Sequence, residues 1–155
     1  MNLLNNPSKI SNSEISEAEN RLGVKFSEEY KLFLLNTNGG IPEQDMLYDF
    51  YDEVTGNENT SVIRQFYALN DEDWQNDIVT IFNIMYQEQM IAKDMLPIAD
   101  DPLGNIICLS LATYDYGTVY YLNHEFENAE TGFLMQSKIA DSFSDFINSL
   151  YTDTN

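Results

Sequence analysis

The stretch from 22 to 42, LGVKFSEEYKLFLLNTNGGIP, constrains the fold most, because it predicts a short amphipathic helix with a firm stop. Ser27 suits the N-cap position, since its hydroxyl can accept a hydrogen bond from a free N–H of the first turn. The i, i+3, i+4 spacing of one buried helical face is kept by Tyr30, Phe33 and Leu34. Gly39 and Gly40 predict a left-handed C-cap, and Pro42 prevents the helix from continuing.

Apolar residues at helical spacing predict three further helices, at 11–23, about 70–91 and about 140–151. Ser11 and Glu14 have the spacing of a capping box at the start of the first of these helices. Clusters of β-branched and aromatic residues predict strands at 46–51, 61–69, 96–99, 106–111, 118–122 and 133–135. Turn-forming residues separate several of these strands, notably at 100–105 and 114–117.

This order of helices and strands, with short connections, predicts a single α+β domain. We expect an antiparallel or mixed twisted sheet, with about four helices packed on one face and at its ends. The domain is expected to span 1–155 with its core at about 9–150. Residues 1–8 and 152–155 are expected to be frayed.

The chain is strongly acidic: 7 Lys and Arg against 26 Asp and Glu give a net charge of −19. Such a field disfavours nucleic acid and anionic membrane surfaces and attracts basic protein partners. The N-terminus lacks the pattern of a signal peptide, and no apolar run approaches the ~20 residues of a membrane span. Cys108 has no second cysteine to pair with, so a cytoplasmic protein is expected.

No group of residues predicts catalysis, a metal site or a cofactor. His124 lacks a second histidine at zinc-site spacing, and Cys108 is expected to be a buried apolar residue. Asp71, Asp73 and Asp77 lack the glycine and the glutamate that complete a calcium loop, and negative charge at a helix start explains them better. A non-enzymatic protein is therefore expected. Because 26 acidic residues make chance pairs inevitable, a hydrolase with paired carboxylates stays a remote alternative.

Three ordered sets of residues resemble a known protein family. The first is Ile15, Glu19, Leu22 and Gly23, followed by Glu28-Glu29-Tyr30-Lys31-x-Phe33-Leu34 and Asn38-Gly39-Gly40-x-Pro42. The second is Leu96-Pro97-Ile98-Ala99-Asp100, Gly104-Asn105, the apolar run through Leu111 and Gly117-x-Val119-Tyr120. The third is Ile139-Ala140-Asp141-Ser142-Phe143 with Phe146-Ile147. Together they resemble the SUKH superfamily, Smi/Knr type, from about 9 to 150. Phe26-Ser27 departs from the Leu-Pro that usually stands there in the family.

The resemblance implies an α+β domain without enzymatic activity. Bacterial members of the superfamily are typically immunity proteins that neutralise a toxin, often a nuclease, and fungal relatives regulate cell-wall synthesis. An acidic protein could occupy the basic groove of such a nuclease, and an intracellular scaffold or regulatory module is the alternative. We expect a monomer or weak homodimer whose acidic and aromatic residues bind the basic partner: Asp45, Tyr48, Asp49, Tyr51, Asp52, Glu53, Asp71, Glu72, Asp73 and Trp74. In the competing interpretation, these aromatics are half-buried strand residues and the acids only face water.

Overall fold

The computed structural model describes residues 1–153 of the chain. The helices are α1 (Asn12–Leu22), α2 (Glu28–Asn36), α3 (Ile78–Gln87) and α4 (Phe143–Ser149), with a 3₁₀ turn η1 (Trp74–Asn76) before α3. The first five strands are β1 (Leu3–Leu4), β2 (Ile41–Pro42), β3 (Met46–Asp52), β4 (Asn57–Val62) and β5 (Gln65–Phe66). The others are β6 (Met95–Asp100), β7 (Ile106–Ser110), β8 (Val119–Glu127), β9 (Leu134–Ala140) and β10 (Tyr151–Thr152).

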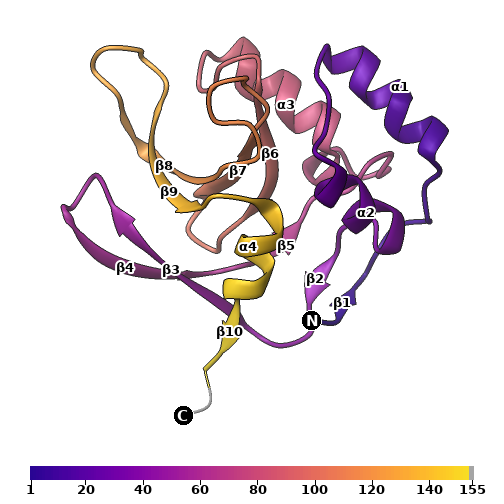
Figure 1. The fold of residues 1–155 in the computed structure, drawn as a ribbon, viewed down its shortest axis with the longest axis horizontal. Coiled ribbons are helices and arrows are strands. Elements are labelled where there is room, and N and C mark those ends of the chain that lie inside the picture. Colours follow the sequence, from indigo (N-terminus) through magenta and orange to yellow (C-terminus); the bar gives the residue numbers. More distant parts are fainter. Residues whose placement is uncertain (154–155) are drawn as a thin grey trace.

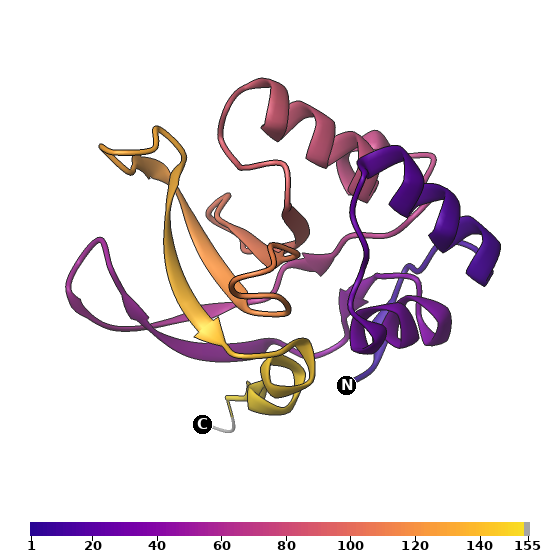
Figure 2. The same cartoon turned by 45° about the horizontal axis from the view of Figure 1, so that its top comes forward.

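The strands form three sheets in which the named strands pair antiparallel. A five-stranded sheet has the order β5-β6-β7-β8-β9, a three-stranded sheet the order β10-β3-β4, and a small sheet pairs β1 with β2. The predicted α+β class is confirmed, although the strands are divided among several sheets. In Figure 1 and Figure 2, α1, α2 and α3 gather on one side, and the β3–β4 and β8–β9 hairpins extend on the other.

The first two helices begin where the sequence predicts. The Ser11 hydroxyl accepts a hydrogen bond from the Glu14 N–H at 3.2 Å, and the Glu14 side chain completes the capping box. The Ser27 hydroxyl caps α2 by accepting from the Tyr30 N–H. Gly23 ends α1 in the left-handed conformation with φ at 71°. Local side-chain to backbone hydrogen bonds therefore set most of these boundaries.

Gly39 and Gly40 do not form the predicted C-cap of α2. The residue at the C-cap is Thr37, in an extended conformation, so the helix has ended before Gly39. A Cβ atom at Gly39 would lie 2.6 Å from the Tyr67 carbonyl oxygen, and one at Gly40 would lie 2.7 Å from the Leu4 carbonyl oxygen. Both glycines therefore let the chain pass close to two other backbone segments.

An aromatic cluster joins the helices to the sheets. The rings of Tyr30 and Phe33 in α2 each lie 5.1 Å from the ring of Phe143 in α4, and Phe33 lies 5.1 Å from Phe66 in β5. A second cluster packs under α3 and includes Phe82, Met85, Ile91, Cys108 and Leu122. The predicted face of Tyr30, Phe33 and Leu34 is thus confirmed as a packing face, with Tyr30 and Leu34 completely buried.

Two sequence predictions need correction in the middle of the chain. The predicted strand 61–69 is split between β4 and β5, which belong to different sheets. Arg64 lies at the break and donates from Nε and Nη2 to Asp100 at 2.8 and 2.6 Å. The third helix begins at Ile78 rather than near 70–73, because Asp77 accepts the N–H of Thr80 and caps it there.

Residues near both ends of the described chain pair with strands further inside it, although 1–8 and 152–155 were expected to be frayed. Leu3 and Leu4 pair with Pro42 and Ile41, and the Leu3 side chain lies in the core. Thr152 pairs with Met46 across β10 and β3. Apolar burial and strand pairing therefore tie both ends down, while 154–155 lie outside the described residues. No helix within 1–153 is long and apolar enough to cross a bilayer.

Candidate functional site

Strand β3 divides the predicted site residues between two faces, because successive side chains of a strand point to opposite sides. Asp49 and Tyr51 are exposed, and Tyr51 keeps 48% of its surface accessible. Tyr48, Phe50 and Asp52 alternate with them and are buried. The acidic stretch is thus one strand with a buried inner face and a solvent-exposed outer face.

The inward residues cannot contact a partner, so two of the predicted binding residues are corrected. Tyr48 is completely buried, with its ring 5.8 Å from that of Phe146, and burial raises the pKa of its hydroxyl. Asp52 is also buried, and its carboxylate accepts hydrogen bonds from the Val54 N–H at 2.9 Å and the Asn59 amide at 3.1 Å. Asp52 therefore shapes the β3–β4 turn.

The outward residues of β3 combine with neighbours from β4 and β10. Register places Asp49 opposite Thr60 and Tyr51 opposite Glu58, while Tyr151 lies beside Leu47 on the other flank. We call this surface the acidic hairpin face and define it as Asp49, Tyr51, Glu53, Glu58, Thr60 and Tyr151. No Lys or Arg occurs between 42 and 63, so the whole hairpin is free of positive charge.

Two hydroxyl groups hold Asp49 in place at the centre of this face. Tyr151 and Thr60 both donate to Asp49 Oδ1 at 2.7 Å. The hydrogen bond from Tyr151, followed by that from Thr60, favours the carboxylate and holds the pKa of Asp49 below its ordinary value. The same contact raises the pKa of the Tyr151 hydroxyl. Asp49 is thus a fixed negative charge flanked by the exposed rings of Tyr51 and Tyr151.

The other predicted site residues lie elsewhere. Asp45 is exposed in the link between β2 and β3, ahead of the paired residues. The 71–74 segment follows β5 and lies near α1, where the Asn70 amide donates to Glu14 at 2.7 Å. Figure 1 and Figure 2 show this segment on the helical side, away from the β3–β4 hairpin. The structure therefore places 45–53 and 71–74 on separate surfaces.

Within 71–74, the aspartate side chains mainly accept hydrogen bonds from nearby backbone N–H groups. Asp71 accepts the N–H of Asp73, and Asp73 accepts the N–H of Gln75, so both stabilise the turn around η1. Glu72 and Trp74 are exposed, and Trp74 keeps 57% of its surface accessible. These two form a smaller candidate contact patch beside α1.

Several other groups of polar residues are structural. Asp101 is buried and accepts hydrogen bonds from Ser61, from the Leu103 N–H, and from both the N–H and the side chain of Asn105. His124 contacts Asn105, and Cys108 is completely buried, which raises the pKa of its thiol. In the described part of the chain, no three His, Cys, Asp or Glu side chains are grouped to hold a metal ion.

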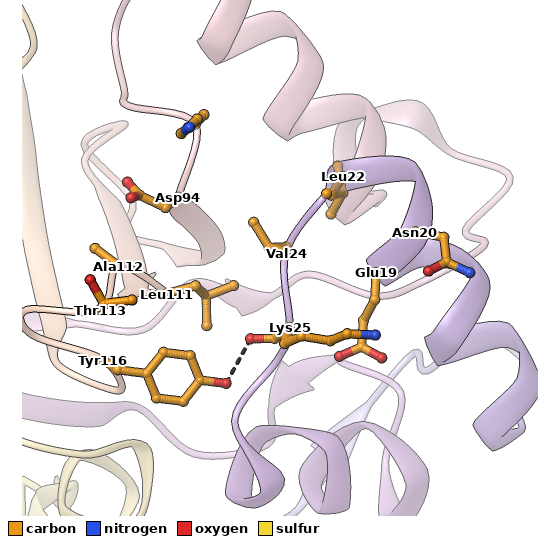
Figure 3. A pocket seen from close by; sticks show the side chains of 12 residues that line it. Glu19, Asn20, Leu22, Val24, Lys25, Asp94, Leu111, Ala112, Thr113 and Tyr116 are labelled. Atoms are coloured by element: carbon orange, nitrogen blue, oxygen red, sulfur yellow. Dashed lines mark hydrogen bonds between the residues drawn. The ribbon is translucent and has the colours of Figure 1, made fainter.

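A groove of about 620 Å³ lies between the α1–α2 link and the β7–β8 turn. Figure 3 shows Tyr116 on one side, with its hydroxyl donating at 2.7 Å to the Lys25 carbonyl oxygen on the other. The Glu19 carboxylate already accepts the Phe26 N–H at 2.8 Å, and Lys93 and Asp94 contribute opposite charges. The groove is thus lined by side chains of both charges and lacks the acidic character expected of the binding surface.

Comparison with known proteins then decides the family. A search of curated proteins finds no match. The family model described as SMI1 / KNR4 family (SUKH-1) matches residues 9–149, which is most of the chain. The chain belongs to the SMI1/KNR4 family (SUKH-1). SUKH proteins are generally non-catalytic, and this membership supports a role as an immunity protein or a regulator.

Three residues of the acidic hairpin face in this SUKH-1 protein were missed by the sequence prediction. Glu58 and Thr60 lie in β4, where Asn57-Glu58-Asn59 has low strand propensity and hides the strand. Tyr151 was assigned to the end of the last helix, yet it belongs to β10. Thr60 and Tyr151 could be recognised only through their contact with Asp49, which depends on the register of the β3–β4 hairpin for Thr60 and on pairing 102 positions apart for Tyr151.

Proposed function

We propose that this protein is an immunity protein that binds and neutralises a basic, nuclease-type toxin domain in the cytoplasm. The acidic hairpin face is the proposed contact surface. The observation that supports it best is a continuous outer face with three carboxylates, two exposed tyrosines and no positive charge. Family membership supports the general role, and the charge pattern supports the choice of partner.

The electrostatic argument is one of complementarity. A nuclease needs Lys and Arg against its polyanionic substrate, so its active groove is basic. An acidic protein is steered to such a groove, and the net charge of −19 extends that attraction beyond the contact itself. Tyr51 and Tyr151 supply the aromatic contacts that usually dominate binding energy, and Asp49 sits between them.

The proposal predicts a toxin domain encoded beside this gene, and the test is co-expression with that domain. The wild-type chain is expected to protect cells, and the double variant Asp49→Asn with Glu58→Gln is expected to bind the purified toxin at least about tenfold more weakly. Glu17→Gln with Glu130→Gln is the matched control, because it removes the same charge from exposed sites elsewhere. Failure of the wild-type chain to protect cells would refute the proposal.

The second candidate is a scaffold or regulatory module, which family membership supports equally at the coarse level. It predicts that affinity capture from the native host yields a partner without toxic activity. In either case we expect a monomer or weak homodimer that binds protein and avoids nucleic acid and membranes, because its net charge repels both. An electrophoretic mobility assay with nucleic acid and a flotation assay with lipid vesicles would test whether the protein binds either one.

A further inference from the structure

The three-stranded sheet ends in an edge strand, β4, whose second side pairs with no described strand. Its register with β3 runs from Leu47–Val62 to Asp52–Asn57 without a bulge, over six residues that include neither Pro nor Lys. Proteins usually blunt such edges with prolines, lysines, bulges or short strands, since an open edge can pair with another chain.

The other sheet edges within 1–153 show those protective devices. Strand β9 carries Lys138, pairs irregularly with β8, and contacts β3, after which the Glu53 N–H donates to the Ser137 hydroxyl. Strands β5 and β10 have only two residues each. β4 is therefore the longest regular edge left open by the described chain.

The hydrogen-bond alternation shows which groups β4 turns outward. The Ile63 N–H donates to the Met46 carbonyl at 3.0 Å, so residues 63, 61, 59 and 57 bond to β3 and the residues between them face the open side. Glu58 and Thr60 therefore point their backbone N–H and C=O groups away from β3. Consistent with this, the Thr60 N–H is taken by the Asn59 side-chain oxygen at 2.8 Å.

Charge indicates what this edge can accept. Glu58 lies on the edge strand itself, Asp49 lies directly behind Thr60, and no residue from 42 to 63 is basic. A second copy of this chain would bring like charges together, which destabilises cross-strand neighbours. A strand carrying Lys or Arg at alternate positions would place its cations beside Glu58 and Asp49 and would leave its backbone free to pair.

We infer that β4 is a docking edge at which a basic extended segment of the protein partner adds a fourth strand to the sheet β10-β3-β4. Backbone hydrogen bonds form with Glu58 and Thr60, and the Asn59 side chain releases the Thr60 N–H as the new strand arrives. The choice of a basic protein partner rests on the proposed function, whereas the open edge does not.

The test uses the full chain, labelled with ¹⁵N, and a synthetic ten-residue peptide of alternating Lys and Val. Peptide binding is expected to slow amide hydrogen exchange at Glu58 and Thr60 at least about tenfold, because both N–H groups become strand-paired. A peptide of the same sequence with alternate backbone nitrogens methylated is expected to lose at least about tenfold in affinity, because it cannot donate. A Glu–Val peptide is the charge control and is expected not to bind.

Two protein variants separate backbone pairing from simple attraction. Glu58→Gln keeps the edge and is expected to weaken Lys–Val peptide binding only a few-fold, about the effect of one exposed charge. Glu58→Pro removes the outward N–H, a substitution that edge strands tolerate, and is expected to abolish binding. The methylated peptide gives the same contrast without altering the protein, in case Glu58→Pro disturbs the hairpin.

Equal affinity of the two Lys peptides, unchanged exchange at Glu58 and Thr60, or no binding of the Lys–Val peptide would each overturn the inference. Concentration-dependent protection of the same amides in the protein alone would assign the edge to a second copy and also overturn it. These outcomes are independent of cell protection, which tests the proposed function. Protection by wild type together with unaffected binding of Glu58→Pro to the toxin would uphold that function and reject the docking edge.

Discussion

At the scale of single residues, close backbone approaches decide what the chain tolerates. Gly39 has φ at 74°, and a Cβ there would meet the Tyr67 and Phe66 carbonyl oxygens at 2.6 and 2.8 Å. Gly39→Ala is expected to lower the free energy of unfolding by at least about 2 kcal/mol, since the strained conformation and the clash add. Gly23→Ala, with φ at 71° and nothing within 4 Å, is the control and should cost about 1 kcal/mol. Urea denaturation measures both, and equal losses would contradict the role given to Gly39.

The contact between Tyr151 and Asp49 gives a second prediction at this scale. Tyr151→Phe removes the hydrogen bond that contributes most to lowering the pKa of Asp49, so this pKa is expected to rise toward its ordinary value. A lowered pKa in the folded state stabilises the protein above the unfolded pKa of about 4 and loses that effect as pH falls through the folded pKa. The variant is therefore expected to be less stable than wild type at pH 7, with the difference disappearing in acid.

Carboxyl NMR titration of Asp49 measures the shift directly. Tyr51→Phe is the control, because it removes a hydroxyl from the same face that does not donate to Asp49. An unchanged pKa of Asp49 in Tyr151→Phe would show that the hydrogen bond does not form in solution.

At the scale of secondary-structure elements, a buried carboxylate ties α1 to the start of α2. Glu19 is only 3% exposed, accepts the Phe26 N–H at 2.8 Å and lies 3.8 Å from the Lys31 ammonium. Glu19→Ala leaves that N–H buried and unpaired, and is expected to cost about 1–3 kcal/mol in the free energy of unfolding. Glu17→Ala, on the exposed side of the same helix, should change it by no more than about 0.5 kcal/mol. Comparable losses in the two variants would rule out the proposed tie.

The elements also show what a single sequence can predict. The N-caps of α1 and α2 were predictable because Ser11 and Ser27 act on residues three positions away. The break between β4 and β5 was not, because it depends on Arg64 pairing with Asp100, 36 positions later. The aromatic residues of 46–51 predicted a strand, but the contacts of Phe50 with Tyr121 and of Tyr48 with Phe146 decide which face is buried. Which residues of this strand are exposed and belong to the candidate site therefore depends on packing with distant parts of the chain.

At the scale of the whole molecule, the net charge of −19 should act in opposite directions on folding and on binding. Raising NaCl from 10 to 500 mM screens self-repulsion and is expected to stabilise the fold by about 1 kcal/mol, or roughly 2–4 °C in Tm. The same salt is expected to weaken binding to a basic partner, mostly through slower association. Calorimetry measures the change in Tm, and stopped-flow measurements follow the association rate with the partner. Binding that is insensitive to salt would contradict the electrostatic part of the proposed function.

The pairing of β10 with β3 has a consequence for synthesis of the protein. The acidic hairpin face joins Asp49 to Tyr151, which lie 102 positions apart in the sequence. A ribosome moving at about 5–20 residues per second therefore exposes β3 and β4 several seconds before the strand that flanks them. During that interval the nascent chain has its carboxylates but lacks the tyrosine that fixes Asp49. Only completed chains therefore carry the whole acidic hairpin face, and shortened translation products lack its Tyr151 side.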